Sequence, residues 1–495
     1  MSQSQRDSRS ASRSGLQLLL ARADDHRPVL EEGLLAETAR GAPRPESLPN
    51  RIDVPTWEQA DAAPNDLEAQ RWGVIAPDGA LGDSLLQAIA PLIELREKQQ
   101  GAPVKTYRVP PDMDARAAER WQRTVLRDAE VPEEERPKYL LILGDLHHVS
   151  IELQQVLAHG AYVGRLHAGH PEGEADLAGY AAYARKVLAH EQRTPEEKGP
   201  DLLLYTAQDG TSATRLGHRL LVEPCLEEMR TRWKAKSPTL NPGLIPYEST
   251  GPDALLRAAG EARAAVMLSV THGLGRPEKG WASPEEQRAT QGALSVGPGL
   301  ALTGDMLRQT PFLPGGMWFC VACFGAATPA KSAFHAWLSL LAKAGAYPGH
   351  PESVLSNLPG PWDRPFLAAL PQALLANEQG PLAIIGHSDL AWALSFTEVD
   401  DPASSRAPHF LSALKVLANG SRAGVALDAL MREYREINNH LMAGYQARED
   451  AQLHGHPDST DPVRQGTLWM QRNDLRGYLL LGDPAARLSM KRTEP

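Results

Sequence analysis

One apolar run organises the predicted fold: Met317-Trp318-Phe319-Cys320-Val321-Ala322-Cys323-Phe324-Gly325-Ala326. Its composition predicts a buried strand, and Gly325 lets the backbone turn sharply just after Cys323. The Cys323 thiol is therefore expected at the carboxyl edge of a sheet, where open α/β folds place their ligand sites.

A second run upstream follows the same plan: Ala264-Ala265-Val266-Met267-Leu268-Ser269-Val270-Thr271-His272-Gly273. It is a hydrophobic strand that ends in a histidine followed by a glycine. If the two strands are neighbours, the Cys323 thiol and the His272 imidazole reach the same edge of the sheet. A thiolate, a base and backbone donors for an oxyanion are what cleavage of a peptide bond requires. The amides of Gly273 and Cys323 are the expected oxyanion donors.

These motifs together resemble a caspase-fold cysteine peptidase of the gingipain-like branch, a group of bacterial caspase-like or CHAT-like peptidases. Thr271-His272-Gly273 resembles the family's Ser-His-Gly, and Cys320–Gly325 resembles its cysteine strand. The interval between His272 and Cys323 is close to the spacing of about 50 residues in caspases. Two later segments extend the resemblance: Ile384–Trp392, like a strand and loop lining the substrate cleft, and Gly477–Pro484, like a closing segment.

The resemblance implies a three-layer α/β/α caspase-like fold with a mostly parallel sheet, preceded by a smaller α/β lobe. It implies a regulated intracellular cysteine endopeptidase that cleaves protein substrates through a dyad of Cys323 and His272. This chemistry needs no metal and no cofactor. An activating protease or a regulatory protein is the expected partner. Val321 stands where caspases carry Gln, so caspase specificity is not implied.

The resemblance also places the substrate pocket. The loop Ala207–Arg215 holds the position from which the family sends a charged residue into the primary pocket. Asp209 would select a basic side chain and Arg215 an acidic one, and both remain open. Asp209 is equally typical of a turn, and Arg215 of a solvent-facing surface. Asp389 and Trp392 are expected in the pocket wall, with Trp392 as an apolar lid.

Two alternatives belong to other functional classes. A serine esterase would use Ser84, in Gly82-Asp83-Ser84-Leu85, or Ser388, in Gly386-His387-Ser388-Asp389-Leu390. The first motif sits at an expected helix start, where capping explains it, and the second lacks the final glycine of a nucleophile elbow. The other alternative is a non-catalytic binding or scaffold protein that keeps the fold.

Cys320 and Cys323 also form a C-x-x-C pair, a pattern found in redox and zinc sites. On a strand, residues three apart point to opposite faces, so the two thiols are not expected to pair. A zinc site is not predicted, because it needs four ligands and the sequence has no second C-x-x-C.

Composition, net charge and cysteine count exclude several other classes of protein. The chain has 495 residues, 42% of them hydrophobic and 23% charged, which is typical of a folded globular protein. A net charge of −10 argues against a nucleic-acid-binding surface. The apolar run Leu16–Leu20 is too short for a signal peptide or a membrane span, and three cysteines make no disulfide framework. A cytoplasmic location without membrane contact is therefore expected.

Four regions are predicted along the chain. Residues 1–50 read as a mobile arm with one short helix near Leu16–Ala23. Strands alternate with helices through an N-terminal α/β lobe (51–200) and a caspase-like catalytic domain (201–400), which favours a parallel sheet. A helical segment (401–495) closes the catalytic domain. The Gly- and Pro-rich stretch Gly275–Leu302 is expected to be a loop that forms the cleft.

Overall fold

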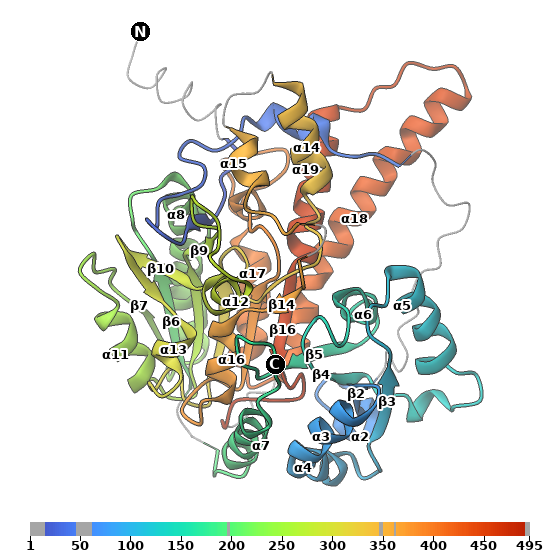
Figure 1. The fold of residues 1–495 in the computed structure, drawn as a ribbon, viewed down its shortest axis with the longest axis vertical. Helices are drawn as coiled ribbons and strands as arrows, with labels where there is room; N and C mark the ends of the chain where they lie inside the picture. The colour runs from blue at the N-terminus through green and yellow to red at the C-terminus, as the bar shows by residue number, and fades with distance from the viewer. Residues whose placement is uncertain (1–14, 46–61, 196–198, 346–349, 361–362, 491–495) are drawn as a thin grey trace.

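A large sheet runs through the molecule (Figure 1). The computed structural model describes residues 15–45, 62–195, 199–345, 350–360 and 363–490. Ten strands pair in the order β3-β2-β4-β5-β16-β15-β12-β8-β6-β7. Their bounds are β2 (Trp72–Pro77), β3 (Lys105–Val109), β4 (Tyr139–Leu143), β5 (Tyr162–Leu166), β6 (Asp201–Thr206), β7 (Asn241–Leu244), β8 (Val266–Val270), β12 (Met317–Val321), β15 (Ala383–His387) and β16 (Tyr478–Gly482).

The sheet consists of two parallel halves that run in opposite directions. Every neighbouring pair is parallel except β15 and β16, which are antiparallel and join the halves. One half is built mainly from the predicted N-terminal lobe and the other from the predicted catalytic domain. The mixed α/β class with a mostly parallel sheet is thus confirmed, and one continuous sheet spans both predicted regions.

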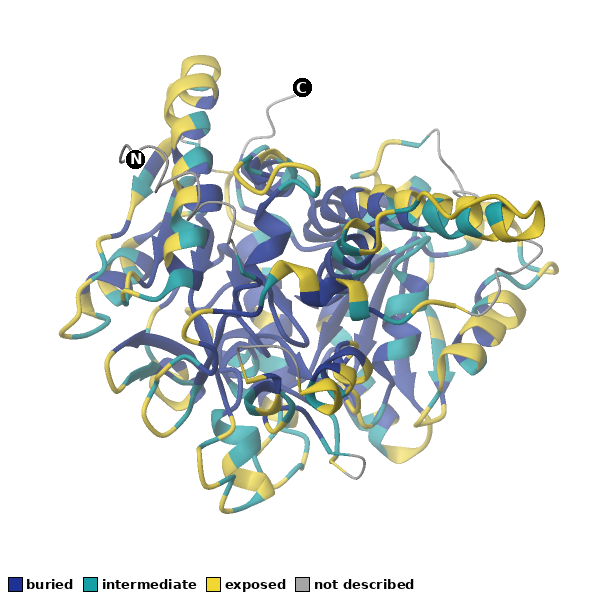
Figure 2. Cartoon of the chain, turned by 90° about the horizontal axis from the view of Figure 1, so that it is seen from above, coloured by how far each residue is buried: buried dark blue, intermediate teal, exposed yellow. Residues whose placement is uncertain are grey.

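Helices cover both faces of the sheet, because nearly every strand is buried on both sides. Successive residues of β12 alternate between two hydrophobic clusters, so Phe319 faces one cluster and Trp318 the other. Cys320 and Cys323 likewise point to opposite faces, as their spacing predicts. Figure 2 shows these buried strands in the middle of the molecule, with exposed surface on the outer helices and turns.

The cluster that contains Cys323 is covered by α8 (Ser212–Gly217), α9 (Glu223–Glu228), α14 (His335–Ala344), α17 (Ala407–Ala418), α18 (Ala423–Leu453) and α19 (Pro462–Arg476). The opposite cluster is covered by α3 (Ala80–Ala88), α4 (Ala90–Gln100), α7 (Leu177–Glu191), α11 (Asp253–Glu261), α13 (Gly304–Leu307) and α16 (Ala369–Ala376). A third, smaller cluster lies under α5 (Ala115–Trp121) and α6 (Ile151–Leu157).

The N-terminal segment differs most from prediction. Instead of a mobile arm with a helix near Leu16–Ala23, residues 16–22 are extended and mostly buried, and β1 (Leu20–Arg22) pairs in parallel with β9 (His272–Gly275). The reason is tertiary: Leu18, Leu19 and Leu20 are 0–1% exposed, and burial in the main core outweighs any local helical preference. We call residues 16–22 the strap.

The stretch Gly275–Leu302 is likewise not a plain loop. It contains α12 (Pro284–Thr290), β10 (Leu294–Gly297) and β11 (Leu300–Leu302). These strands complete a small four-stranded sheet in the order β1-β9-β10-β11. Gly and Pro in this stretch therefore mark turns between short elements, which composition alone does not separate from one long loop.

Candidate functional site

The Cys323 thiol lies just beyond the end of β12, in a fully buried position. Its Sγ accepts a hydrogen bond from the Ala391 N–H at 3.1 Å and donates to the Ala391 carbonyl at 3.7 Å. Burial raises the pKa of Cys323 well above its ordinary value. The group is therefore a neutral thiol at neutral pH, whereas a nucleophilic cysteine needs a stabilised thiolate.

His272 is directed toward a different set of partners. Its Nε2 lies 2.9 Å from the Thr211 hydroxyl and 3.5 Å from an Asp209 carboxylate oxygen, and its Nδ1 has no hydrogen-bond partner. Burial lowers the pKa of His272, and the nearby charge of Asp209 opposes that shift. Within the described residues no hydrogen bond joins this imidazole to Cys323. The predicted dyad is thus two neighbouring neutral groups.

Two backbone amides converge on one oxygen. The N–H groups of Gly273 and Cys323 both donate to the Leu19 carbonyl, at 3.1 and 3.2 Å. A side chain at position 273 would clash with the Cys323 carbonyl, so the close approach of β9 to this turn requires a glycine. The pair of donors predicted from the two motifs does come together, and its acceptor is a carbonyl of the strap.

The strap is paired on its other edge with the segment that follows β15. The Leu19 N–H donates to the Ala391 carbonyl at 3.1 Å, and the Ala393 N–H donates to the Gln17 carbonyl at 2.9 Å. Leu18 and Trp392 face each other in this antiparallel pair. We call the surrounding backbone, Gly273–Gly275, Cys323 and Ala391–Ala393, the strand slot. The strap thus completes hydrogen bonds on both sides of the slot.

The strap is held at both ends by the returning chain. The Leu16 and Leu34 backbones exchange hydrogen bonds, and the Val29 N–H donates to the Leu20 carbonyl at 2.9 Å. Between these contacts the chain turns through Asp24 and Asp25, which are exposed. Residues 16–22 of the same molecule thus lie extended and buried between the two sides of the strand slot.

Trp392 is a core residue, which corrects the predicted lid. It is 1% exposed, and its ring packs against Phe334 and Trp337 with centroids 5.8 and 5.7 Å away. Its backbone N–H donates to an Asp474 carboxylate oxygen at 2.7 Å. A lid must border solvent or ligand, whereas this indole is enclosed by the main hydrophobic cluster.

The charged residues predicted for the pocket also have other roles. The Asp389 carboxylate accepts hydrogen bonds from the N–H groups of Leu390 and Ala333, both at 2.8 Å, and so fixes the turn. Asp209 accepts from the Thr211 and Thr214 hydroxyls beside His272. Arg215 is exposed, and the partner it has among the described residues is Ser212, on its own helix. None of the three charges projects into the strand slot as a free partner for a ligand.

Neither serine is activated. Ser84 lies within α3, where its hydroxyl donates to the Ala80 carbonyl at 3.0 Å, so it is neither a nucleophile nor the predicted cap. Ser388 is buried and donates to the Gly477 carbonyl at 2.9 Å. The adjacent His387 lies within hydrogen-bond distance of the carbonyls of Asp389 and Asp474, so neither ring nitrogen serves Ser388 as a base.

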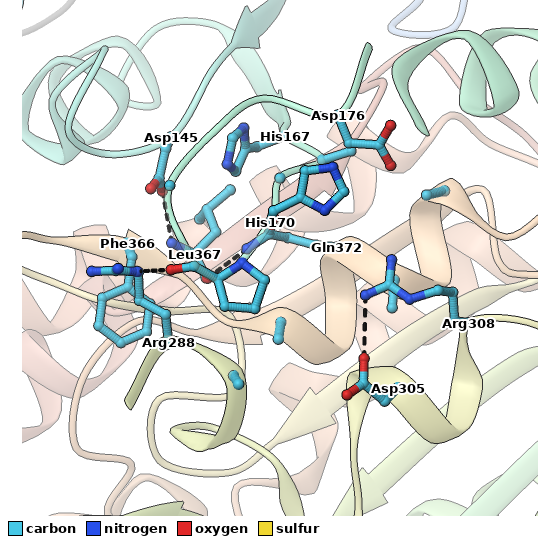
Figure 3. Close-up of a pocket in the computed structure, with 18 residues that line it drawn as sticks. Asp145, His167, His170, Asp176, Arg288, Asp305, Arg308, Phe366, Leu367 and Gln372 are labelled. Carbon is cyan, nitrogen blue, oxygen red and sulfur yellow. Dashed lines mark hydrogen bonds and ion pairs between the residues drawn. The ribbon is translucent and has the colours of Figure 1, made fainter. Parts of the chain in front are cut away.

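A second, polar pocket lies where β4 and β5 end (Figure 3). Its charged groups are already paired inside the chain: Asp145 accepts from the Leu367 N–H at 2.8 Å, Arg308 bonds to Asp305 at 3.3 Å, and Arg288 donates to the Pro171 carbonyl. Arg308 thus pairs with a carboxylate, while Asp145 and Arg288 bond to backbone groups, so each of these three already has a partner within the chain. No group of three potential metal ligands occurs in the part of the chain that the structure describes.

Comparison with known proteins finds no matching family model and no matching curated protein. Three of the solved structures that match weakly are named here. A periplasmic sugar-binding protein from Pseudomonas fluorescens is 13% identical over 40% of this chain and 60% of its own, with a TM-score of 0.14. A leucine-binding protein from Thermotoga maritima is 11% identical (80% and 86% covered, TM-score 0.16). A fatty acid ABC transporter substrate-binding protein from Thermomonospora curvata is 12% identical (81% and 79%, TM-score 0.16).

The comparisons give the predicted caspase-like family no support, because no family model and no curated protein matches this chain. TM-scores this low assign neither a shared fold nor a ligand to this chain. The site itself corrects the prediction of a gingipain-like cysteine endopeptidase that cleaves protein substrates through a Cys323–His272 dyad: the buried Cys323 thiol is hydrogen-bonded to Ala391 and its pKa is raised, whereas His272 contacts Thr211.

The structure also bears on whether the chain could span a membrane. In the described ranges, no helix combines the length and the apolar character that crossing a membrane requires. The cytoplasmic location stays a prediction.

Proposed function

We propose that this chain is a non-catalytic protein that binds an extended apolar peptide in its strand slot. The observation that carries the proposal is the Leu19 carbonyl, which accepts from the amides of Gly273 and Cys323 at the same time. The strap then represents the bound peptide, supplied by the molecule itself. A neutral buried thiol beside the slot has a structural role in this function, since it accepts the Ala391 N–H.

The chemistry of the slot explains both affinity and selectivity. Main-chain hydrogen bonds on two edges hold any extended chain, while alternate side-chain positions select among sequences. The strap presents three consecutive leucines, Leu18, Leu19 and Leu20, and all three are buried. Gly275 contacts the Leu20 side chain closely. The expected ligand is therefore a peptide with large aliphatic residues at three adjacent positions.

The attachment of the strap explains how binding would be controlled. A tethered segment competes at an effective concentration in the millimolar range for short flexible linkers. An external peptide can enter only when the strap leaves, through a cut in the exposed Asp24–Asp25 turn or through displacement by a partner. The slot consists of β9 on one side and Ala391–Ala393 on the other, and the proposal does not depend on the three-layer caspase-like arrangement, which stays a prediction.

The test is peptide exchange in a chain cut at the turn. A recognition sequence for a specific protease is inserted between Asp24 and Asp25, and the cut protein is incubated with a labelled peptide of residues 15–24. We expect one peptide to bind per molecule, and none to bind the uncut protein. The matched control is the same peptide with N-methylated Leu19, which cannot donate to the Ala391 carbonyl. Equal binding of both peptides, or no exchange after cutting, would disprove the proposal.

A further inference from the structure

An open pocket lies at the amino ends of β8 and β12, whereas the strand slot lies beyond their carboxyl ends. It has a volume of about 220 Å³. Four segments enclose it: the end of α7 with the turn that follows, the turn before β8, the turn before β12 and the chain after β16. We call it the arginine pocket, and its lining includes His190, Arg193, Thr194, Arg263, Ala264 and Ser489. It shares no residue with the strand slot, so the inference does not depend on peptide binding.

The side chains of the arginine pocket supply positive charge and hydrogen-bond donors without a carboxylate. Arg193 and Arg263 are exposed and line it together with the hydroxyl-bearing Thr194 and Ser489. No aspartate or glutamate is among the described residues of the lining. Neither guanidinium forms an ion pair within the part of the chain that the structure describes. The pocket therefore holds two positive charges that face solvent.

The carboxylates nearest in sequence do not neutralise these charges. Glu191 is buried and bonds to Arg96 at 2.7 Å. Asp201 accepts from two N–H donors at 2.9 Å, one of which is the Arg263 backbone amide. Glu261, at the end of α11, is exposed and makes no ion pair with any described residue. An anion from solution is thus the available partner for the two guanidinium groups.

Arg193 is supported by a neutral imidazole. Its Nη1 lies 3.5 Å from Nδ1 of His190, which is 6% exposed. Burial, Arg193 and Lys186 lower the pKa of His190 to about 4, so the ring is neutral near pH 7. A Cβ on Gly315 would clash with this ring, which means that the imidazole packs directly on the turn before β12. A neutral nitrogen can orient the guanidinium without cancelling its charge.

Arg263 extends from a turn whose backbone is fixed on both sides. The Arg263 N–H donates to the Asp201 carboxylate at 2.9 Å, and the Met317 N–H donates to the Ala265 carbonyl at 2.8 Å. Between them Ala264 has a φ of 42°, in the left-handed region that residues with a side chain rarely adopt. Such conformations persist only where the surrounding contacts fix them, and they are common at ligand sites.

We propose that the arginine pocket binds the phosphate group of a small phosphorylated molecule. Arginine pairs well with phosphate oxygens, and a phosphate carries a charge close to −2 at neutral pH, which matches two guanidinium groups. The hydroxyls of Thr194 and Ser489 are further donors for its oxygens. A carboxylate has one charge and two oxygens, so it would leave donors unused. The volume is below the range for drug-sized ligands, which restricts the rest of the molecule to a few atoms beside Ala264 and Pro314.

The experiment is a calorimetric titration of the full-length protein with inorganic phosphate and with glycerol 3-phosphate, at fixed pH and at an ionic strength set with chloride. Acetate and glycerol are the reference solutes, one with a single charge and the other with none. We expect one phosphate compound to bind per molecule at concentrations where neither reference binds. Tighter binding of glycerol 3-phosphate would identify a phosphate ester as the ligand, and equal binding would identify free phosphate. Phosphate compounds that bind no better than acetate would overturn the proposal.

Variants locate the site. Arg193→Gln and Arg263→Gln each remove one charge from an exposed side chain, so both should fold and each should weaken phosphate binding about tenfold or more. The matched control is Arg257→Gln, because Arg257 is exposed on the neighbouring α11 and does not line the pocket. The Tm of each variant without phosphate checks the fold. Binding that either pocket variant leaves unchanged, or that the control weakens as much, would refute the assignment.

Discussion

Burial determines the chemistry of the individual side chains in the strand slot. Cys323 has the sequence context of a nucleophile, yet its thiol is enclosed and hydrogen-bonded to Ala391. His272 has the context of a base, yet it contacts Thr211 and Asp209. Sequence predicts which residues approach each other, because both lie at strand ends. It does not predict their ionisation, which depends on segments far away in the chain.

The reactivity of Cys323 follows from this burial. We expect native protein to react with iodoacetamide at neutral pH as slowly at Cys323 as at Cys225, because burial raises the pKa of both thiols. The measurement is the rate of labelling at each cysteine by peptide mass spectrometry. Labelling of Cys323 that is much faster than labelling of Cys225 would indicate an activated thiolate and contradict a non-catalytic site.

The position of Trp392 predicts a loss of stability. Trp392→Ala removes a fully buried indole from its contacts with Phe334 and Trp337, so the free energy of unfolding should fall by about 3–5 kcal/mol. Trp469→Ala is the control, because Trp469 is only partly buried and also contacts Phe334. The measurement is denaturant unfolding. A smaller loss for Trp392→Ala than for the control would place Trp392 outside the core.

At the scale of elements, the sequence predicts the strands well and their N-terminal partner poorly. The strands that carry His272 and Cys323 are neighbours, as their apolar runs indicate, since β8 pairs with β12 from end to end. The sequence does not predict the strap, because the run Leu16–Leu20 is too short to show the hydrophobic period of a helix or a strand. Its partners also lie far along the chain. A short run of leucines with no amphipathic pattern was the available signal, and it indicates burial without deciding between a strand and a helix.

The pairing of the strap predicts the effect of single prolines. Leu19→Pro removes the N–H that donates to the Ala391 carbonyl, so the strap should detach more often and be cut faster by added protease. Gln17→Pro is the comparison variant, because no backbone partner of the Gln17 N–H is seen in the described structure, and Gln17→Ala measures the separate loss of the side-chain hydrogen bond to the Glu32 carbonyl. Limited proteolysis followed by mass spectrometry compares the two. Equal rates of cutting within residues 15–27 would show that the strap is not held by this hydrogen bond.

At the scale of the whole molecule, one sheet and a buried ion network unite the chain. Arg96 contacts Asp483 at 2.6 Å and Glu191 at 2.7 Å, and all three side chains are at most 1% exposed. The Trp72 indole N–H donates to Asp483 at 2.9 Å. Composition and strand order predict the α/β class, whereas the reversal between the two halves depends on β16, which joins from the end of the chain. Local patterns contain no signal for that pairing.

A half-buried histidine gives the molecule a pH dependence. Burial lowers the pKa of His148 to about 4 from an ordinary 6.5. Between pH 6.5 and pH 4, the imidazole is therefore protonated in the unfolded chain and neutral in the folded protein. Because protonation then favours the unfolded chain, the free energy of unfolding is not reduced by His148 above pH 6.5 and decreases as the pH falls from 6.5 toward 4. Asp389 and Asp474, whose pKa values burial raises, act in the opposite direction, so wild type alone does not isolate the effect.

The comparison of wild type with His148→Asn removes that ambiguity. His148 Nδ1 has no hydrogen-bond partner, so the substitution deletes no bond at that atom. We expect wild type to lose more stability than the variant between pH 7 and pH 5 in urea unfolding. Identical losses in the two proteins would show that His148 is not held neutral by the fold.

The occupancy of the strand slot is tested most directly by hydrogen–deuterium exchange at the amides that hold the Leu19 carbonyl. Peptides that cover Gly273 and Cys323 report these amides by mass spectrometry, in protein cut between Asp24 and Asp25. We predict slow exchange while the strap is bound, faster exchange after it is removed, and slow exchange again when the peptide of residues 15–24 is added. Exchange that is unchanged by the loss of the strap and by the added peptide would contradict a peptide-binding slot.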